Sequence, residues 1–197
     1  MLGHSLGGIV AMVYAMHYPE HPAKLILSST STQPTPGERS FAVFDRLGGP
    51  PARAAAIAFW TDPSEDSLVN YEALCLPLYT RTKPPSGFYE RAIRNPAMRL
   101  VFFEAELHRL DLLRRLNRIT CPTVIAAGED DPITPDAEME EIAAAIRPDL
   151  VRLERFADAG HGVYSDRPGV SGYCAILSGC EATCGRPADR RSGLPRL

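Results

Sequence analysis

Three short segments of the sequence carry residue types that together could perform nucleophilic acyl transfer. The first, Gly3-His4-Ser5-Leu6-Gly7-Gly8, fits the pattern G-x-S-x-G and precedes a helical pattern over Ile9–Tyr18. A serine on a sharp strand-to-helix turn has a strained backbone, so we expect that side chains at Gly3 and Gly7 would clash. The helix start directs N–H groups toward developing negative charge, and we expect the backbone N–H of Leu6 to be one oxyanion donor.

The other two segments supply a base and an acid, which a serine nucleophile requires. Asp131 follows the apolar run 122–127, and His161, between two glycines, follows the strand pattern 150–156. Ligands of parallel sheets bind at the carboxyl ends of the strands, where both residues are expected to lie. The chain order Ser5, Asp131, His161 therefore predicts a Ser-His-Asp triad.

The residues alone leave alternatives open. Asp130 is a rival acid and Asp158 a weaker one. Asp131 could instead cap the following helix, although Asp136 is the better N-cap candidate, and His161 could be a turn residue without a catalytic role. Three elements in this order, each at a strand end, are more specific than any one of them, which favours the triad.

The elements that must position these residues follow from hydrophobic periodicity. Strand patterns that alternate with helices indicate an α/β fold with a parallel sheet; the strands are expected at 24–29, 122–127 and 150–156, and a helix at 136–146. Between them, the proline-rich segment 34–116 contains short helical patterns, among them 52–60 and 90–116. We therefore expect a core formed by 1–33 and 117–168, interrupted by a helical insert.

The composition changes again at about residue 169. Residues 169–197 hold three of the five cysteines and have no periodic pattern, so we expect a disordered tail. The tail cysteines lack C-x-x-C spacing and a nearby histidine, so no metal site is predicted. Cys75 and Cys121 are expected to be small buried residues.

Composition and charge restrict the class of protein. The 197 residues are 45% hydrophobic and 23% charged, which is typical of a globular domain. The net charge of −3 and a pI near 6.0 argue against nucleic-acid or anionic-membrane partners. The sequence contains neither an apolar run of about 18 residues nor a basic leader followed by an apolar stretch. We expect a soluble cytoplasmic protein.

With these segments in place, the sequence resembles the α/β-hydrolase fold family over about residues 1–168. The matching pieces are Gly-His-Ser5-Leu-Gly-Gly, Gly128-Glu-Asp-Asp131-Pro-Ile-Thr-Pro and Gly160-His161-Gly162. In the family, the acid is the fourth residue of a segment that begins with glycine. Counted from Gly128, this position is Asp131 and not Asp130. The blocks Leu-Ile-Leu-Ser-Ser-Thr and Gly-His-Gly-Val-Tyr-Ser-Asp-Arg-Pro are similar to those of proline iminopeptidase-like members, and esterases and lactonases share much of them.

The resemblance implies a mechanism and a substrate class. His161 would take the proton of Ser5, which would attack a small ester or amide, including an N-terminal proline peptide, and water would release the acyl-enzyme. Asp131 would hold the imidazole, and His4 would line the substrate pocket. The segment 34–116 falls where many members carry a lid. No metal or organic cofactor is implied.

The sequence departs from the family at both ends. The family places several strands and helices before the nucleophile, including the loop with the second oxyanion donor, whereas four residues precede Ser5. We expect strand 24–29 to become an exposed apolar edge. Our hypothesis is a C-terminal portion of a longer hydrolase whose last segment has been replaced, as a shifted reading frame would do. The alternative function is that of an inactive remnant or partner-binding fragment.

Overall fold

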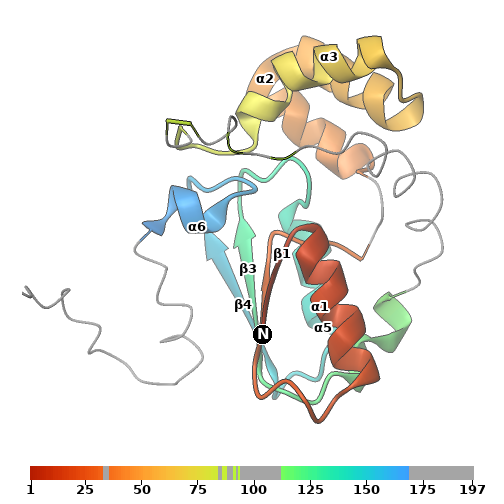
Figure 1. The fold of residues 1–197 in the computed structure, drawn as a ribbon, viewed down its shortest axis with the longest axis vertical. Helices are drawn as coiled ribbons and strands as arrows, with labels where there is room; N and C mark the ends of the chain where they lie inside the picture. Colours follow the sequence, from red (N-terminus) through yellow and green to blue (C-terminus); the bar gives the residue numbers. More distant parts are fainter. Residues whose placement is uncertain (33–35, 84–85, 88–90, 92, 94–111, 169–197) are drawn as a thin grey trace, which may run out of the picture.

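The computed structural model describes residues 1–32, 36–83, 86–87, 91, 93 and 112–168. Its centre is one sheet of four parallel strands in the order β1-β2-β3-β4, whose carboxyl ends all lie at one edge (Figure 1). The strands are β1 (Leu2–His4), β2 (Leu25–Ser28), β3 (Thr123–Gly128) and β4 (Val151–Phe156). The predicted α/β class with a parallel sheet is confirmed.

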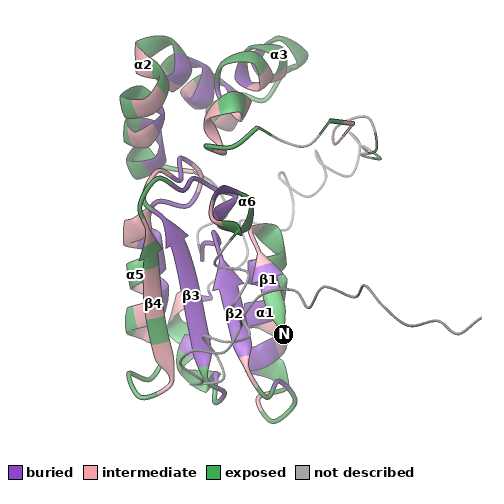
Figure 2. Cartoon of the chain, turned by 90° about the vertical axis from the view of Figure 1, so that its left-hand side faces the viewer, coloured by how far each residue is buried: buried purple, intermediate pink, exposed green. Residues whose placement is uncertain are grey.

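Two helices cover one face of the sheet, α1 (Leu6–His17) and α5 (Asp136–Ala145) (Figures 1 and 2). Every residue of β2 and β3 is buried, as expected for strands in the middle of a parallel sheet. The shared core also includes the short 3-10 helix η4 (Leu113–Arg118). Its largest fully buried side chains include Met12, Met16, Leu25, Leu27, Leu116, Ile125, Met139 and Ile142.

The expectation that strand 24–29 forms an exposed edge is wrong. β1 pairs with β2 in parallel, with Leu2 opposite Ile26 and His4 opposite Ser28, so the edge is β1. The pairing continues at the chain start, where the Ile26 N–H donates to the Met1 carbonyl at 2.9 Å. Three extended residues are therefore enough to cover β2. The exposed apolar side chain at the edge of the sheet is that of Leu2, which is 58% exposed.

Beyond the carboxyl edge lie α2 (Glu38–Thr61), α3 (Glu65–Leu74) and the 3-10 helix η1 (Leu76–Leu78) (Figure 1). Helix α2 has a kink at Gly49, where φ is +74°, and Pro50 and Pro51 then begin its second half. Proline is tolerated there because the first N–H groups of a helix lack intrahelical partners. These helices share a core of their own, with members Phe41, Phe44, Phe59 and Tyr71.

We call α2, α3 and η1, with the chain that follows to Lys83, the helical segment. Loops after β3 and β4 hold this segment against the sheet. Asp130, after β3, pairs with Arg46 of α2 at 2.6 Å and also with Arg81. Asp166, in the short helix α6 (Val163–Asp166), accepts hydrogen bonds from the backbone N–H groups of Arg81 and Thr82, each at 2.9 Å. Contacts to α2 and to the chain after η1 thus hold this segment beside the carboxyl edge.

Part of the prediction concerns residues outside the described ranges. The expected tail 169–197 is one such part, and so is most of the expected helix 90–116, whose last residues, 113–116, belong to the 3-10 helix η4. The proposed boundaries at residues 34, 117 and 169 stay predictions. Within the described ranges, none of the helices has the length and apolar character needed to cross a membrane.

We predict that Asp130→Asn loosens the helical segment and destabilises the fold in a pH-dependent way. Burial alone would raise the pKa of Asp130, but Arg46 and Arg81 outweigh it and lower the pKa. A lowered carboxyl pKa contributes stability above pH 4 or so and loses it as pH falls further. Because both guanidinium groups are partly exposed, we expect a loss of about 1 kcal/mol at pH 7, measured by urea unfolding, that disappears at low pH.

The matched control for this variant is Asp149→Asn. Asp149 pairs with Arg147 at 2.6 Å, but both side chains are more than half exposed. We expect a change below about 0.5 kcal/mol at every pH. Equal losses in both variants, or a loss in Asp130→Asn that persists at low pH, would show that the bridging carboxylate does not hold the segment.

Candidate active site

Ser5 lies between β1 and α1 in a strained backbone conformation. Its φ is +52° and its ψ is −125°, a region that residues with side chains rarely adopt. Hydrogen bonds fix this turn on both sides: the Ser5 N–H donates to the Ser28 carbonyl at 3.0 Å, and the Thr30 hydroxyl donates to the Ser5 carbonyl at 2.8 Å. These hydrogen bonds thus hold Ser5 in a conformation that costs about 1–3 kcal/mol.

The glycines around Ser5 do not all serve the same purpose. A Cβ at Gly3 would lie 2.4 Å from the Gly7 carbonyl oxygen, which agrees with the expected crowding. A Cβ at Gly7 would meet no described atom within 4 Å, so the expectation for this position is wrong. The crowded position is instead Gly8, where a Cβ would lie 2.4 Å from the side chain of Thr30. The close approach therefore occurs between α1 and the loop after β2.

The structure brings the three predicted residues into one hydrogen-bonded chain. Nε2 of His161 lies 2.9 Å from Oγ of Ser5, and Nδ1 lies 2.9 Å from Oδ2 of Asp131. A carboxylate only accepts, so Nδ1 carries the proton toward Asp131 and Nε2 is left to accept from the serine hydroxyl. This arrangement can withdraw the serine proton.

Asp131 is a fully buried carboxylate with a complete set of donors. It is 1% exposed and accepts from the N–H groups of Ile133 and Thr134, at 2.8 and 3.0 Å, and from the Thr134 hydroxyl at 2.7 Å. Burial alone would raise the pKa of Asp131, but the charge of His161 and these hydrogen bonds lower it. Asp131 is therefore ionised and able to orient His161.

The rival acids are engaged elsewhere. Asp130 binds Arg46 and Arg81, as described above. Asp158 has an 86% exposed side chain and pairs with Arg167. Asp136 is the first residue of α5, whose N-cap is Pro135 and not Asp136, and it binds Arg155 at 2.8 Å. Among these acidic residues, only Asp131 contacts His161.

Two residues that the sequence did not single out brace the loop around His161. The backbone N–H of His161 donates to the Tyr79 carbonyl at 2.6 Å, and that of Gly160 donates to Oδ2 of Asp166 at 2.9 Å. A Cβ at Gly160 would lie 2.4 Å from the same Tyr79 carbonyl oxygen, so glycine is required there. Asp166 stands in a block that already showed a resemblance, whereas no sequence pattern pointed to Tyr79.

The family model described as alpha/beta hydrolase fold matches residues 1–168, a range that includes all three members of this hydrogen-bonded chain. The chain belongs to the alpha/beta hydrolase fold family. The fold and the site thus lie in the matched part of the chain, while residues 169–197 fall outside it.

Relatives within this family show how broad its chemistry is. Monoacylglycerol lipase ABHD6 of Bos taurus is 28% identical over 176 residues, covering 85% of this chain and 50% of the lipase. Proline iminopeptidase PfmaB of Pestalotiopsis fici is 24% identical, covering 85% of this chain and 62% of PfmaB. The structure of a proline iminopeptidase from Mycobacterium smegmatis matches 90% of this chain and 64% of that one, with a TM-score of 0.67 at 17% identity. The chain spans about half the length of the curated lipase it matches.

In this α/β-hydrolase fold, His4 and Leu6 occupy different surroundings. The His4 ring lies against the rings of His161 and Tyr164, each with 5.1 Å between centroids. Burial, and then the nearby His161, lower the pKa of His4 to about 4, so His4 is neutral at pH 7. Leu6 is the first residue of α1, and the first N–H groups of a helix have no partner within it.

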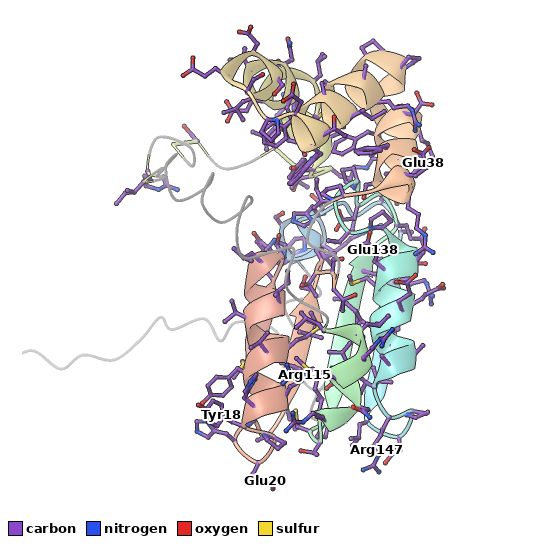
Figure 3. The ribbon with its side chains drawn as sticks, turned by 90° about the vertical axis from the view of Figure 1, so that its right-hand side faces the viewer. Tyr18, Glu20, Glu38, Arg115, Glu138 and Arg147 are labelled. Atoms are coloured by element: carbon purple, nitrogen blue, oxygen red, sulfur yellow. The ribbon has the colours of Figure 1, made fainter. Side chains whose placement is uncertain are left out.

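A second buried carboxyl, Glu138, lies close to this site in the first turn of α5. Figure 3 shows it at the end of α5 nearest to α2. Burial raises the pKa of Glu138 to about 7, a hydrogen bond from Ser31 opposes this, and the charge of Asp131 adds to it. Partial protonation of Glu138 therefore limits the negative charge that would otherwise accumulate beside Asp131.

The cysteines and other potential ligands do not gather in the described part of the chain. There, no group of three or more His, Cys, Asp or Glu residues has the geometry to hold a metal ion. Cys75 and Cys121 are free thiols and buried, as predicted. Burial raises the pKa of the Cys75 thiol to about 12, which makes it a poor nucleophile. The remaining three cysteines lie outside the described residues.

We predict opposite effects on stability for alanine at two neighbouring glycines. Gly7→Ala adds a methyl group in open space and gains helix propensity, so we expect stabilisation by about 0.5–1 kcal/mol. Gly8→Ala forces the new methyl group against Thr30, so we expect a loss of about 1–3 kcal/mol. Urea unfolding of both variants checks this, and a Gly8→Ala variant as stable as Gly7→Ala would contradict the close packing of α1 on Thr30.

Proposed function

We propose that this chain is a serine hydrolase that cleaves a small ester or amide through an acyl-enzyme, with N-terminal proline peptides among the candidate substrates. Ser5 would be the nucleophile, His161 the general base and Asp131 the orienting acid. The observation that carries this proposal is the continuous hydrogen-bonded chain from Ser5 Oγ through both ring nitrogens of His161 to the buried carboxylate of Asp131. A chain of this kind makes a hydroxyl nucleophilic at neutral pH.

The proposed reaction has two proton-balanced halves. In the first, Nε2 of His161 takes the Ser5 proton while Oγ attacks the substrate carbonyl, and the same proton then passes to the leaving alcohol or amine. In the second, water loses a proton to Nε2 and attacks the acyl-enzyme, and Ser5 recovers its proton as the acid departs. The Leu6 N–H, at the positive end of α1, would donate to the oxyanion. Asp131 stays ionised throughout.

The named relatives support a substrate class that includes both esters and amides. One is named a monoacylglycerol lipase and another a proline iminopeptidase, so the family includes enzymes for ester and amide bonds. Because this chain spans about half of the lipase, its own substrate is part of the proposal. We include in it the role of residues 34–116 as a lid, supported by the position of α2 and α3 beyond the carboxyl edge (Figure 1). A cytoplasmic location stays a prediction.

We predict that a fluorophosphonate probe forms one adduct per chain, attached to Ser5. Intact-mass spectrometry should show a stoichiometric shift for the wild type and for Ser86→Ala, a control at an exposed serine, but none for Ser5→Ala. The physical reason is that only a serine paired with a base attacks the phosphorus centre rapidly. Absence of an adduct on folded wild-type chain would contradict the proposal and favour the alternative, an inactive or partner-binding fragment.

We predict a second effect, on the rate of this labelling. Asp131→Asn should slow it on the order of 10⁴-fold, because an amide in place of the carboxylate favours the wrong tautomer of His161. Asp158→Asn, at an exposed rival acid, should label at the wild-type rate. A larger loss in Asp130→Asn than in Asp131→Asn would show that the orienting acid has been assigned to the wrong residue.

A further inference from the structure

Two aromatic rings lie against the imidazole of His161. The His4 ring, from β1, lies 5.1 Å away between centroids with an interplanar angle of 51°. The Tyr79 ring, from the chain after η1, lies 5.6 Å away and stands nearly perpendicular, at 76°. His161 itself is 8% exposed, so these rings replace solvent around it. Neither ring is a member of the hydrogen-bonded chain to Ser5 and Asp131.

Contacts outside the site hold both rings in place. The Tyr79 hydroxyl shares a hydrogen bond with the Tyr71 hydroxyl, and the Tyr79 ring contacts Phe44, so it belongs to the core of the helical segment. The His4 ring packs edge-on against Tyr164. The backbone of Tyr79 accepts the His161 N–H at 2.6 Å, independently of its side chain. The ring positions are therefore fixed before any reaction.

Both rings are uncharged at neutral pH. Burial, and then the neighbouring Tyr71, raise the pKa of Tyr79 well above its usual value, so the phenol stays protonated. Burial lowers the pKa of His4 to about 4, so it does not compete with His161 for a proton. A positive charge on His161 would thus lie within about 6 Å of the centroids of two uncharged aromatic rings.

We propose that His4 and Tyr79 are positioning residues that form an aromatic cage around His161 and stabilise its cationic form. The idea rests on the proposed function, since in the proposed reaction His161 becomes a cation when it takes the Ser5 proton. A cation within about 6 Å of an aromatic centroid is attracted by the ring's quadrupole. An interaction that exists only with the charged ring lowers the barrier instead of strengthening ground-state binding.

Other groups also act on this ring, and none of them belongs to the side chain of His4 or Tyr79. Asp131 accepts from Nδ1, and Ser5 contacts Nε2. Further charged groups near these contacts are Glu138, a buried carboxyl that is coupled to Asp131, Asp130, which is paired with two arginines, and Asp166, which binds the Gly160 N–H. Substitution of a cage ring therefore changes the aromatic contact and leaves these charges unaltered.

The test replaces each ring by an aliphatic group and, as a matched control, by another aromatic ring. The variants are His4→Leu with His4→Phe, and Tyr79→Leu with Tyr79→Phe, each checked for folding by circular dichroism. The primary measurement is the NMR titration midpoint of the His161 ring, which requires no catalytic activity. Loss of a cage ring should move this midpoint down by about 0.5 to 1.5 pH units, whereas the Phe variants should stay near the wild type.

The secondary measurement is the rate of fluorophosphonate labelling at pH 7.5. The Leu variants should label about 3- to 30-fold more slowly than their Phe partners. If a ring only fills space, its Leu variant would label more slowly without a change in the titration midpoint of His161. That result overturns the cage proposal, and so does an unchanged midpoint in both Leu variants. If the midpoint shifts but wild-type Ser5 is never labelled, the cage stands and the hydrolase proposal fails.

Discussion

The parallel alignment of the four strands is the constraint on which the site depends. Ser5 follows β1 directly, Asp131 follows β3 and His161 follows β4. Ser5 and His161 are 156 positions apart in sequence, and the pairing of β1 with β2, β2 with β3 and β3 with β4 brings them to hydrogen-bond distance. Because every strand runs in the same direction, all three loops leave from one edge. An antiparallel strand at any of these positions would send its residue to the opposite edge.

This geometry has an energetic cost that the neighbouring elements offset. The positive φ of Ser5 costs about 1–3 kcal/mol, and a buried carboxylate such as Asp131 would be prohibitive without partners. The turn at Ser5 is therefore hydrogen-bonded on both sides, and Asp131 has donors for both oxygens. Both features lie beside well-buried strands, where a rigid environment can hold them. The strain at Ser5 and the buried charge of Asp131 thus both lie at the place where chemistry is proposed.

The sequence predicted the fold class and the regular elements because their signals are local. Apolar runs marked β2, β3 and β4 to within a residue or two, and the order of strands and helices implied a parallel sheet. The helix after Ser5 begins at Leu6 and not at Ile9, because the glycines that weaken the helical pattern are nonetheless helical. These errors at element ends are small because periodicity fixes the middle of an element better than its boundaries.

Features set by contacts distant in the sequence were not predictable in this way. Whether Gly7 or Gly8 is crowded depends on Thr30, which a motif centred on Ser5 does not contain. The coverage of β2 by β1 depends on a register that three residues cannot reveal. The order Ser5, Asp131, His161 suggested a group of three, but the choice among Asp130, Asp131 and Asp158 rested on a family resemblance. The structure separates these acids by their partners, which the sequence does not specify.

The helical segment does more than lie above the site, because it contacts His161 directly. Its aromatic core extends through Tyr71 and Tyr79 to the ring of His161, and its backbone accepts the His161 N–H. Asp130, adjacent to Asp131, and Asp166, after His161, bind the same segment. The residues on either side of the site therefore hold the segment, and the segment in turn holds the imidazole. Contacts thus run from the core of α2 and α3 through Tyr79 and His161 to Ser5, although neither helix contributes a member of the hydrogen-bonded chain.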